Sequence, residues 1–208
     1  PDVGGGFGSK IYHYGEEALV LAAAKKQGLP VRWTADRSES FLTDAHGRDH
    51  VTKIEMASTK DGEILAIRTE TLANVGAYLS NFSTATPTFL HGTLMAGPYK
   101  VPHVYVNVKT VFTNTAPVDA YRGAGRPEAT FSIERVVDKM CRELGLDPFE
   151  VRRKNLIQPD QFPYTTPVGL VYDTGNYQAT LDKLIELADV AGFDKRAAAS
   201  KAKGKLRG

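Results

Sequence analysis

The sequence predicts an α+β domain in which mixed or antiparallel sheets pack against helices. Helix-like and strand-like segments alternate irregularly, and two strand-like segments are joined by a tight turn at residues 60–62. A doubly wound parallel sheet would instead need regular β-α-β alternation. The 208 residues, 42% of them hydrophobic and 24% charged, have the composition of an ordinary globular protein that buries a substantial core.

Helical periodicity and end signals predict most of the helices. Asp36 with Glu39, and Asp147 with Glu150, fit the capping-box pattern in which a helix begins after an Asp and carries Glu three residues later. Gly145 closes the clearest helix. The predicted helices are residues 16–26, 37–42, 86–95, 128–144, 148–155, 177–191 and 193–203.

Alternating apolar and polar residues predict the strands. Residues 51–58 and 63–72 are expected to form a hairpin within a sheet that has one solvent-facing side. The valine-rich segment 101–114 fits either one strand or a bent pair. Residues 30–34 predict a further short strand, and residues 159–167 predict a loop.

Charge and cysteine content exclude several classes of function. The last fourteen residues hold six Lys or Arg and no acid. The rest of the chain has 20 basic and 24 acidic residues, so it lacks the excess of positive charge that is typical of nucleic-acid-binding proteins. No apolar run approaches the roughly 20 residues of a membrane span, and no secretory signal is present, so we expect a cytoplasmic protein. The single Cys141 excludes an internal disulfide and an iron–sulfur cluster held by this chain alone, and is expected to be a small buried hydrophobe.

Two glycine-rich segments carry most of the functional information. Residues 4–8 read GGGFG and residues 120–126 read AYRGAGR. Glycine lets the backbone approach a ligand closely, and successive exposed N–H groups can cradle an anion. Each segment alone could be a tight turn, but the pair suggests two strips of backbone that hold a phosphate-bearing cofactor.

Familiar nucleotide and metal motifs do not fit. A dinucleotide fingerprint would need Gly where Ser9 or Glu128 stands, and a phosphate-binding loop would need Gly directly before Lys10. His46 and His50 have the spacing of a zinc pair but lack the Glu that follows the first His of such sites. We therefore expect these histidines to be surface or hydrogen-bonding residues.

Four segments in order resemble a known family. They read PDVGGGFGSK, GLPVRWTADRSESF, KDGEILAIRTETLANVGAY and AYRGAGRPEATFSIERVVDKMCRELGLDPFEVRRKNLI. Together they resemble the molybdenum-cofactor-binding region of the xanthine dehydrogenase, aldehyde oxidase and carbon monoxide dehydrogenase large subunits, especially the form II carbon monoxide dehydrogenase-like branch. The resemblance covers about residues 1–176, and AYRGAGRPEA with EVRRKN is its most diagnostic part.

The resemblance implies a domain organisation and a set of cofactor contacts. Residues 1–160 would be a first molybdopterin-binding domain that lacks its N-terminal part, and 161–208 a linker with the start of a second, so we expect a fragment of a longer chain. Amide groups and an arginine suit an anionic cofactor, and we expect the two loops to lie together on one concave face. The implied cofactor-binding residues are Gly5, Gly6, Phe7, Gly8, Arg122 and Gly123.

Departures from the family pattern concern the substrate. Ile11, Leu90 and Ala124 stand where the resemblance places the Glu, Arg and Phe that contact purines in xanthine-oxidising members. Gly123 stands where copper-containing carbon monoxide dehydrogenases carry Cys, so no thiolate can bridge copper here. The resemblance thus implies hydroxylation of an aldehyde or a heteroaromatic ring with water as the oxygen source.

The remaining implications concern catalysis and partners. The family's catalytic glutamate would lie beyond Gly208, so no catalytic residue is assigned, and Glu128 is interpreted as a charge at a helix start. Without that base, a non-catalytic relic or assembly module is the alternative. The implied cofactor is molybdopterin in its cytosine dinucleotide form. [2Fe–2S] and FAD are expected on partner subunits or domains, and the assembly is expected to be an oligomer of heterotrimers.

Overall fold

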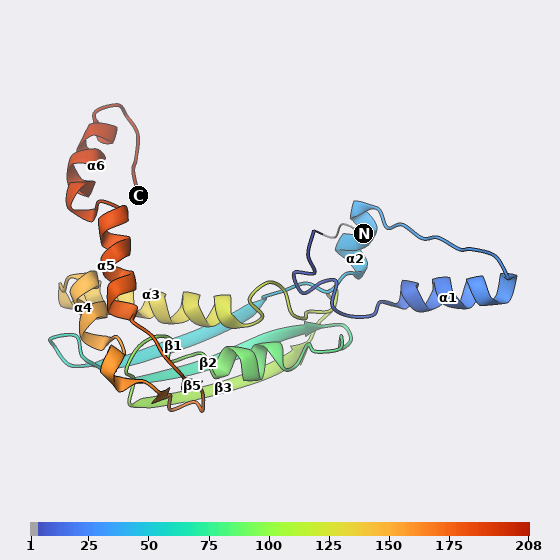
Figure 1. The fold of residues 1–208 in the computed structure, drawn as a ribbon, viewed down its shortest axis with the longest axis horizontal. Helices are drawn as coiled ribbons and strands as arrows, with labels where there is room; N and C mark the ends of the chain where they lie inside the picture. The colour runs from blue at the N-terminus through green and yellow to red at the C-terminus, as the bar shows by residue number, and fades with distance from the viewer. Residues whose placement is uncertain (1–3) are drawn as a thin grey trace.

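The computed structural model describes residues 4–208, and its centre is a mixed three-stranded sheet (Figure 1). Strands β1 (His50–Ser58) and β2 (Ile64–Gly76) form the antiparallel hairpin, and β3 (His103–Phe112) pairs in parallel with β2. A second, two-stranded antiparallel sheet joins β4 (Tyr164–Thr165) to β5 (Val171–Tyr172). The predicted α+β class with mixed sheets is confirmed.

Helices lie over the sheet and at both ends of the molecule. Helix α3 runs along the sheet, α1 extends away from the body at one end, and α5 with α6 stands at the other (Figure 1). The helices are α1 (Gly15–Gln27), α2 (Arg37–Thr43), α3 (Arg126–Leu144), α4 (Pro148–Asn155), α5 (Tyr177–Leu187) and α6 (Phe193–Lys201), with a π-helix η1 (Thr86–Leu90) and two short 3₁₀ turns, η2 (Pro159–Gln161) and η3 (Val190–Gly192).

The core lies between one face of the sheet and α3. The side chains of Ile64 and Ile67 on β2 pack with Ile133 and Val137 on α3, and each of the four is at most 1% exposed. Cys141 belongs to the same cluster, as expected of a small buried hydrophobe. The opposite face of the sheet stays in solvent, which confirms the predicted one-sided sheet.

The structure corrects three predicted elements and decides between the two alternatives for a fourth. Residues 30–34 are extended but pair with no strand of the described chain. The helix expected over 86–95 is shorter: it is a π-helix over residues 86–90, in which the Leu90 N–H reaches the Ala85 carbonyl, and helical backbone continues only to Gly92. Segment 101–114, for which either one strand or a bent pair was expected, contains the single strand β3. Helix α5 ends at Leu187, shortly before Asp189 adopts a left-handed φ of 46°.

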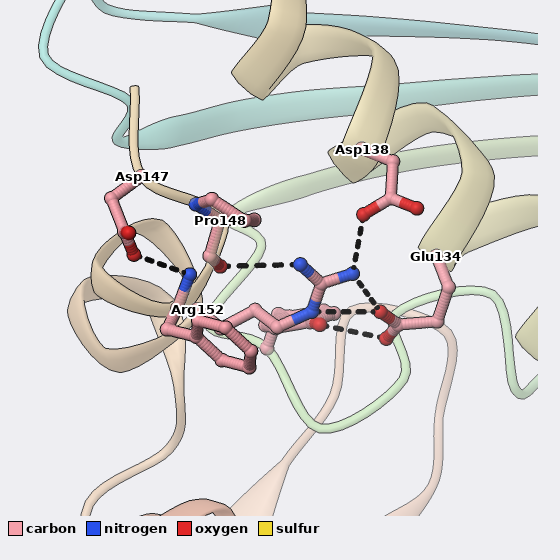
Figure 2. Close-up of polar contacts among 7 residues, drawn as sticks. Glu134, Asp138, Asp147, Pro148 and Arg152 are labelled. Carbon is pink, nitrogen blue, oxygen red and sulfur yellow. Dashed lines mark hydrogen bonds and ion pairs between the residues drawn. The ribbon is translucent and has the colours of Figure 1, made fainter. Parts of the chain in front are cut away.

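Helix α4 is fastened to α3 by a half-buried cluster around Arg152 (Figure 2). The Arg152 guanidinium donates to Glu134 at 2.7 Å and to Asp138 at 2.9 Å, and the Tyr99 hydroxyl donates to the other Glu134 oxygen at 2.7 Å. Burial alone would lower the pKa of Arg152, but these hydrogen bonds raise it above its ordinary value. The guanidinium therefore stays charged and holds the two helices together.

Asn155, at the end of α4, fixes the helix to the turn of the β1–β2 hairpin. Its side-chain oxygen accepts from the Ile64 N–H at 2.9 Å, and its amide donates to the Gly62 carbonyl at 2.8 Å. The neighbouring Lys154 ammonium reaches the Asp61 carboxylate at 2.7 Å. The EVRRKN segment is thus a structural clamp between α3, α4 and the hairpin.

Replacing Asn155 by Ala should lower the free energy of unfolding by about 2–4 kcal/mol, because a buried N–H and a buried carbonyl lose their partners. Urea denaturation measures the change. Asn114→Ala, at an exposed position, is the matched control and should change it by less than about 0.5 kcal/mol. Equal stabilities of the two variants would contradict the clamp.

Candidate cofactor-binding site

The two glycine loops touch through their backbones. The Arg122 N–H donates to the Phe7 carbonyl at 2.8 Å, and the Arg122 guanidinium lies 5.4 Å from the centre of the Phe7 ring. Gly8, at φ 98°, lies so close to the other loop that a Cβ built on it would be 2.1 Å from the Ala120 oxygen. The predicted proximity of the loops is confirmed, and it depends on glycine at position 8.

The GGGFG loop presents unused amide groups. It folds into two consecutive turns, in which the Lys10 N–H donates to the Gly6 carbonyl at 3.2 Å and the Ile11 N–H to the Gly8 carbonyl at 3.1 Å. Phe7 has a left-handed φ of 50° and its side chain is 47% exposed. The N–H groups of Phe7 and Gly8 donate to no acceptor within residues 4–208, with Phe7 exposed and Gly8 buried against the second loop.

The AYRG segment forms a β-turn that leads into α3. The Ala124 N–H donates to the Tyr121 carbonyl at 2.7 Å, and Gly123, the third residue of the turn, has φ 98°. A positive φ at that position characterises a type II turn and favours glycine. The Gly123 N–H, like those of the first loop, has no acceptor among the described residues.

Gly125 seats this turn against η1. At φ 84° its backbone lies so close that a Cβ would be 2.5 Å from the Thr86 oxygen and 2.8 Å from the His91 nitrogen. Below it, the fully buried Asp119 accepts from the N–H groups of Phe82 at 2.9 Å and Ala120 at 2.5 Å. The turn thus rests on a rigid base of backbone contacts.

Tyr12 ties the first loop to the same base. Burial, and then the nearby Asp119 carboxylate, raises the pKa of Tyr12 to about 12, so the phenol stays protonated at neutral pH. Tyr14 adds a second attachment, because its hydroxyl donates to the Ser9 carbonyl at 2.5 Å. Tyr12 thus contacts Asp119 beside the second loop, and Tyr14 contacts Ser9 directly after the first loop.

Arg48 is a site residue that the sequence did not single out. Its guanidinium donates to the carbonyls of Tyr121 at 3.3 Å and Arg122 at 2.7 Å, and lies 5.6 Å from the centre of the Tyr121 ring. Residues 46–50 attract attention for their histidines, yet His46 Nε2 donates to the Phe41 carbonyl at 3.1 Å, as expected of a hydrogen-bonding residue. The available signal was Gly47, directly before Arg48, where a Cβ would lie 2.3 Å from the Tyr121 Cβ.

His50 pairs with a different residue. Its ring meets the ring of His91 edge to face, with centroids 4.9 Å apart. Within residues 4–208, no group of three His, Cys, Asp or Glu side chains is arranged to hold a metal ion. The two histidines of the 46–50 segment therefore serve separate contacts.

The predicted substrate-pocket residues lie on both sides of the loop junction. Leu90 ends η1, and its carbonyl carbon is 3.0 Å from the Cβ position of Gly125, directly after Ala124. Ile11 lies on the other loop, 65% exposed and close to Gly6. Because Gly125 packs against Leu90, Leu90 lies near Ala124 beside the second loop. Ile11 lies on the first loop.

Two cavities adjoin the junction. One of about 450 Å³ is lined by residues that include Ser9 and Tyr121, the neighbours of the two loops. Another of about 640 Å³ is lined by residues that include Arg48, His50 and Glu128. Glu128 stands in the first turn of α3 as predicted, and both of its carboxylate oxygens are buried without a hydrogen-bond partner in the described part of the chain.

Comparison with known proteins identifies the family. The family model described as "Molybdopterin cofactor-binding domain" matches residues 1–156, and the chain belongs to this family. The large chain of carbon monoxide dehydrogenase from Hydrogenophaga pseudoflava is 39% identical over 97% of this chain. The nicotine 6-hydroxylase large subunit from Paenarthrobacter nicotinovorans is 34% identical over 100% of it.

A solved structure has the same fold. Quinoline 2-oxidoreductase from Pseudomonas putida 86 superimposes with a TM-score of 0.91 at 36% identity, over 98% of this chain and 26% of that one. The chain likewise spans 25% of the carbon monoxide dehydrogenase chain and 26% of the nicotine hydroxylase subunit. None of the helices in residues 4–208 has the length and apolar character needed to cross a membrane.

Gly8→Ala should force the two loops apart, because the new Cβ would overlap the Ala120 carbonyl and φ would be strained. We expect the free energy of unfolding to fall by at least about 2 kcal/mol in chemical denaturation. Gly15→Ala is the matched control, since a Cβ there meets nothing within 4 Å. A Gly8 variant as stable as the Gly15 variant would show that the loops do not need this contact.

Stability should depend on pH through His91, which lies fully buried beneath Gly125. Burial, and then the neighbouring His50, lowers the pKa of His91 to about 4 from the ordinary 6.5. Between these values the unfolded chain binds a proton that the folded chain does not. Folding stability is therefore retained above about pH 6.5 and is lost by up to about 3 kcal/mol as the pH falls toward 4.

Urea denaturation between pH 4 and 7 measures this dependence. His91→Gln should remove this part of the pH dependence, whereas the matched His103→Gln, at an exposed position, should retain it. The same pH slope in the wild-type protein and the His91 variant would exclude His91 as its source.

Proposed function

We propose that this chain is the cofactor-cradling portion of a molybdenum-dependent hydroxylase or dehydrogenase. The observation that carries the proposal is the junction of the two glycine loops. There the N–H groups of Phe7, Gly8 and Gly123, which have no acceptor within residues 4–208, belong to the residues at or next to the contact between Phe7 and the exposed Arg122. Several amide donors beside one permanent cation form a site for an anionic group.

The residues present fit a pyranopterin cofactor that carries phosphate and an oxo-metal centre. Gly8 allows the two loop backbones to come close, and Gly125 packs the second loop against η1. Gly5, at φ 113°, lies against the Phe7 ring, whereas a Cβ on Gly6 would meet only Ile11, at 3.9 Å. A guanidinium group is a permanent cation that suits an anionic ligand. When bound, the molybdenum cofactor supplies the two-electron oxidation, with water as the source of oxygen. The proposed cofactor-binding residues are Gly5, Gly6, Phe7, Gly8, Arg122 and Gly123.

We propose an aldehyde or a heteroaromatic compound as the substrate. Ile11, Leu90 and Ala124 offer no polar group to the edges of a purine, and unpaired polar edges disfavour binding strongly. Two of the similar proteins are named for quinoline and nicotine, both of which contain nitrogen heterocycles. Gly123 supplies no thiolate for copper.

The proposal extends to the whole protein. The catalytic base would be a glutamate outside residues 1–208, and 161–208 would link two molybdopterin-binding domains. We propose that the cofactor is the cytosine dinucleotide form of molybdopterin and that partner subunits or domains carry [2Fe–2S] and FAD. We further propose an oligomer of heterotrimers located in the cytoplasm. The names "large chain" and "large subunit" of the similar proteins support separate partner subunits.

The test is metal and pterin analysis of the full-length protein expressed with molybdate. We expect close to one molybdenum and one pterin per chain, and turnover with an aldehyde or a heteroaromatic compound. Arg122→Met should lower the bound molybdenum and the turnover about tenfold or more, because a charge-assisted contact is lost. Arg142→Met, on the exposed side of α3, is the control and should retain both. A wild-type protein without molybdenum would favour a non-catalytic module.

A further inference from the structure

We propose that Arg48 is a positioning residue that fixes the direction in which the Gly123 N–H points. The inference rests on the proposed function, because it assigns this N–H to the cofactor. The turn at residues 121–124 contains the peptide units that Arg48 contacts. Arg48 binds the carbonyl oxygens of two consecutive units, at Tyr121 and Arg122.

In a trans peptide the C=O and N–H groups point in opposite directions. The unit between Tyr121 and Arg122 shows this directly: its carbonyl accepts from Arg48, and its N–H donates to the Phe7 carbonyl at 2.8 Å on the other side. The next unit has its carbonyl on Arg48 at 2.7 Å. Its N–H, which belongs to Gly123, therefore points away from Arg48 and has no acceptor among the described residues.

The direction of this N–H is otherwise weakly determined. Type I and type II turns differ by a flip of the central peptide unit, which here joins Arg122 to Gly123. Glycine adopts the φ values of either turn type. A flip would turn the Gly123 N–H through about 180° and place the carbonyl oxygen, an electron-rich group, where an anion is to bind. The charged fork of Arg48 selects the type II orientation.

The backbone around Arg48 is built for this contact. Arg48 and Asp49 have φ values of 76° and 73°. Residues other than glycine rarely adopt such values, and these conformations persist only where the surrounding structure holds them. Asn74 supplies that hold, because its side chain donates to the Asp49 carboxylate at 2.7 Å and its N–H to the Asp49 carbonyl at 3.1 Å. Gly47 lies against Tyr121, where a Cβ would be 2.3 Å from the Tyr121 Cβ.

The test uses Arg48→Met and Arg48→Lys in the full-length protein, with Arg142→Met as control. In a crystal structure of the Met variant we expect the peptide between Arg122 and Gly123 to be flipped. Its molybdenum content after gel filtration should fall about tenfold, with a melting temperature near that of the control. The Lys variant keeps a charge but not the fork, and should retain the orientation with an intermediate molybdenum content.

Two outcomes would overturn the proposal. One is a Met variant with wild-type peptide orientation and molybdenum content. The other is a fall in molybdenum that follows only a lowered melting temperature, with the peptide unflipped, because a merely structural role would give that result. If the wild-type protein binds no molybdenum, the proposed function fails, whereas the peptide orientation in the Met variant still decides the role of Arg48.

Discussion

The site depends on one backbone contact, the approach of Gly8 and Phe7 to residues 120–122. The hydrogen bond from the Arg122 N–H to the Phe7 carbonyl at 2.8 Å joins segments more than a hundred residues apart in the chain. A side chain on Gly8 would occupy the space of the Ala120 carbonyl. Because the contact is made by backbone alone, the amides beside it keep fixed directions, which an anion site requires.

The scaffold that sets this junction is held by polar clamps as well as by the apolar core. Arg152 joins α4 to α3, and Asn155 joins α4 to the β1–β2 turn (Figure 2 shows the first of these). Helix α3 begins at Arg126, directly after Gly125. The clamps thus hold the C-terminal part of α3, whereas the first residues of α3 follow the AYRG turn. Through α3, the EVRRKN segment supports the position of that turn.

Local chemistry explains what the sequence could predict. Helices α1, α2 and α4 were found because their ends carry their own signals, such as the left-handed Gly28 after α1 and the capping Asp36 and Asp147. The strand expected at residues 30–34 failed because a strand needs a partner, which no local pattern reveals. The two loops were found from their glycines. Arg48 was missed because its role comes from a contact with residues 73 and 74 positions away.

Backbone strain identifies the same place independently. Phe7, Arg48, Asp49 and Ala124 are four of the five non-glycine residues with positive φ in the described chain, and all four lie in the segments that meet at the junction. Such conformations cost about 1–3 kcal/mol each and persist where the surrounding structure holds them, often at ligand sites. A chain selected for stability alone would place Gly or Asn at these positions. The strain, the amides that have no acceptor within residues 4–208 and the Arg122 guanidinium over the Phe7 ring therefore coincide where the two glycine loops meet.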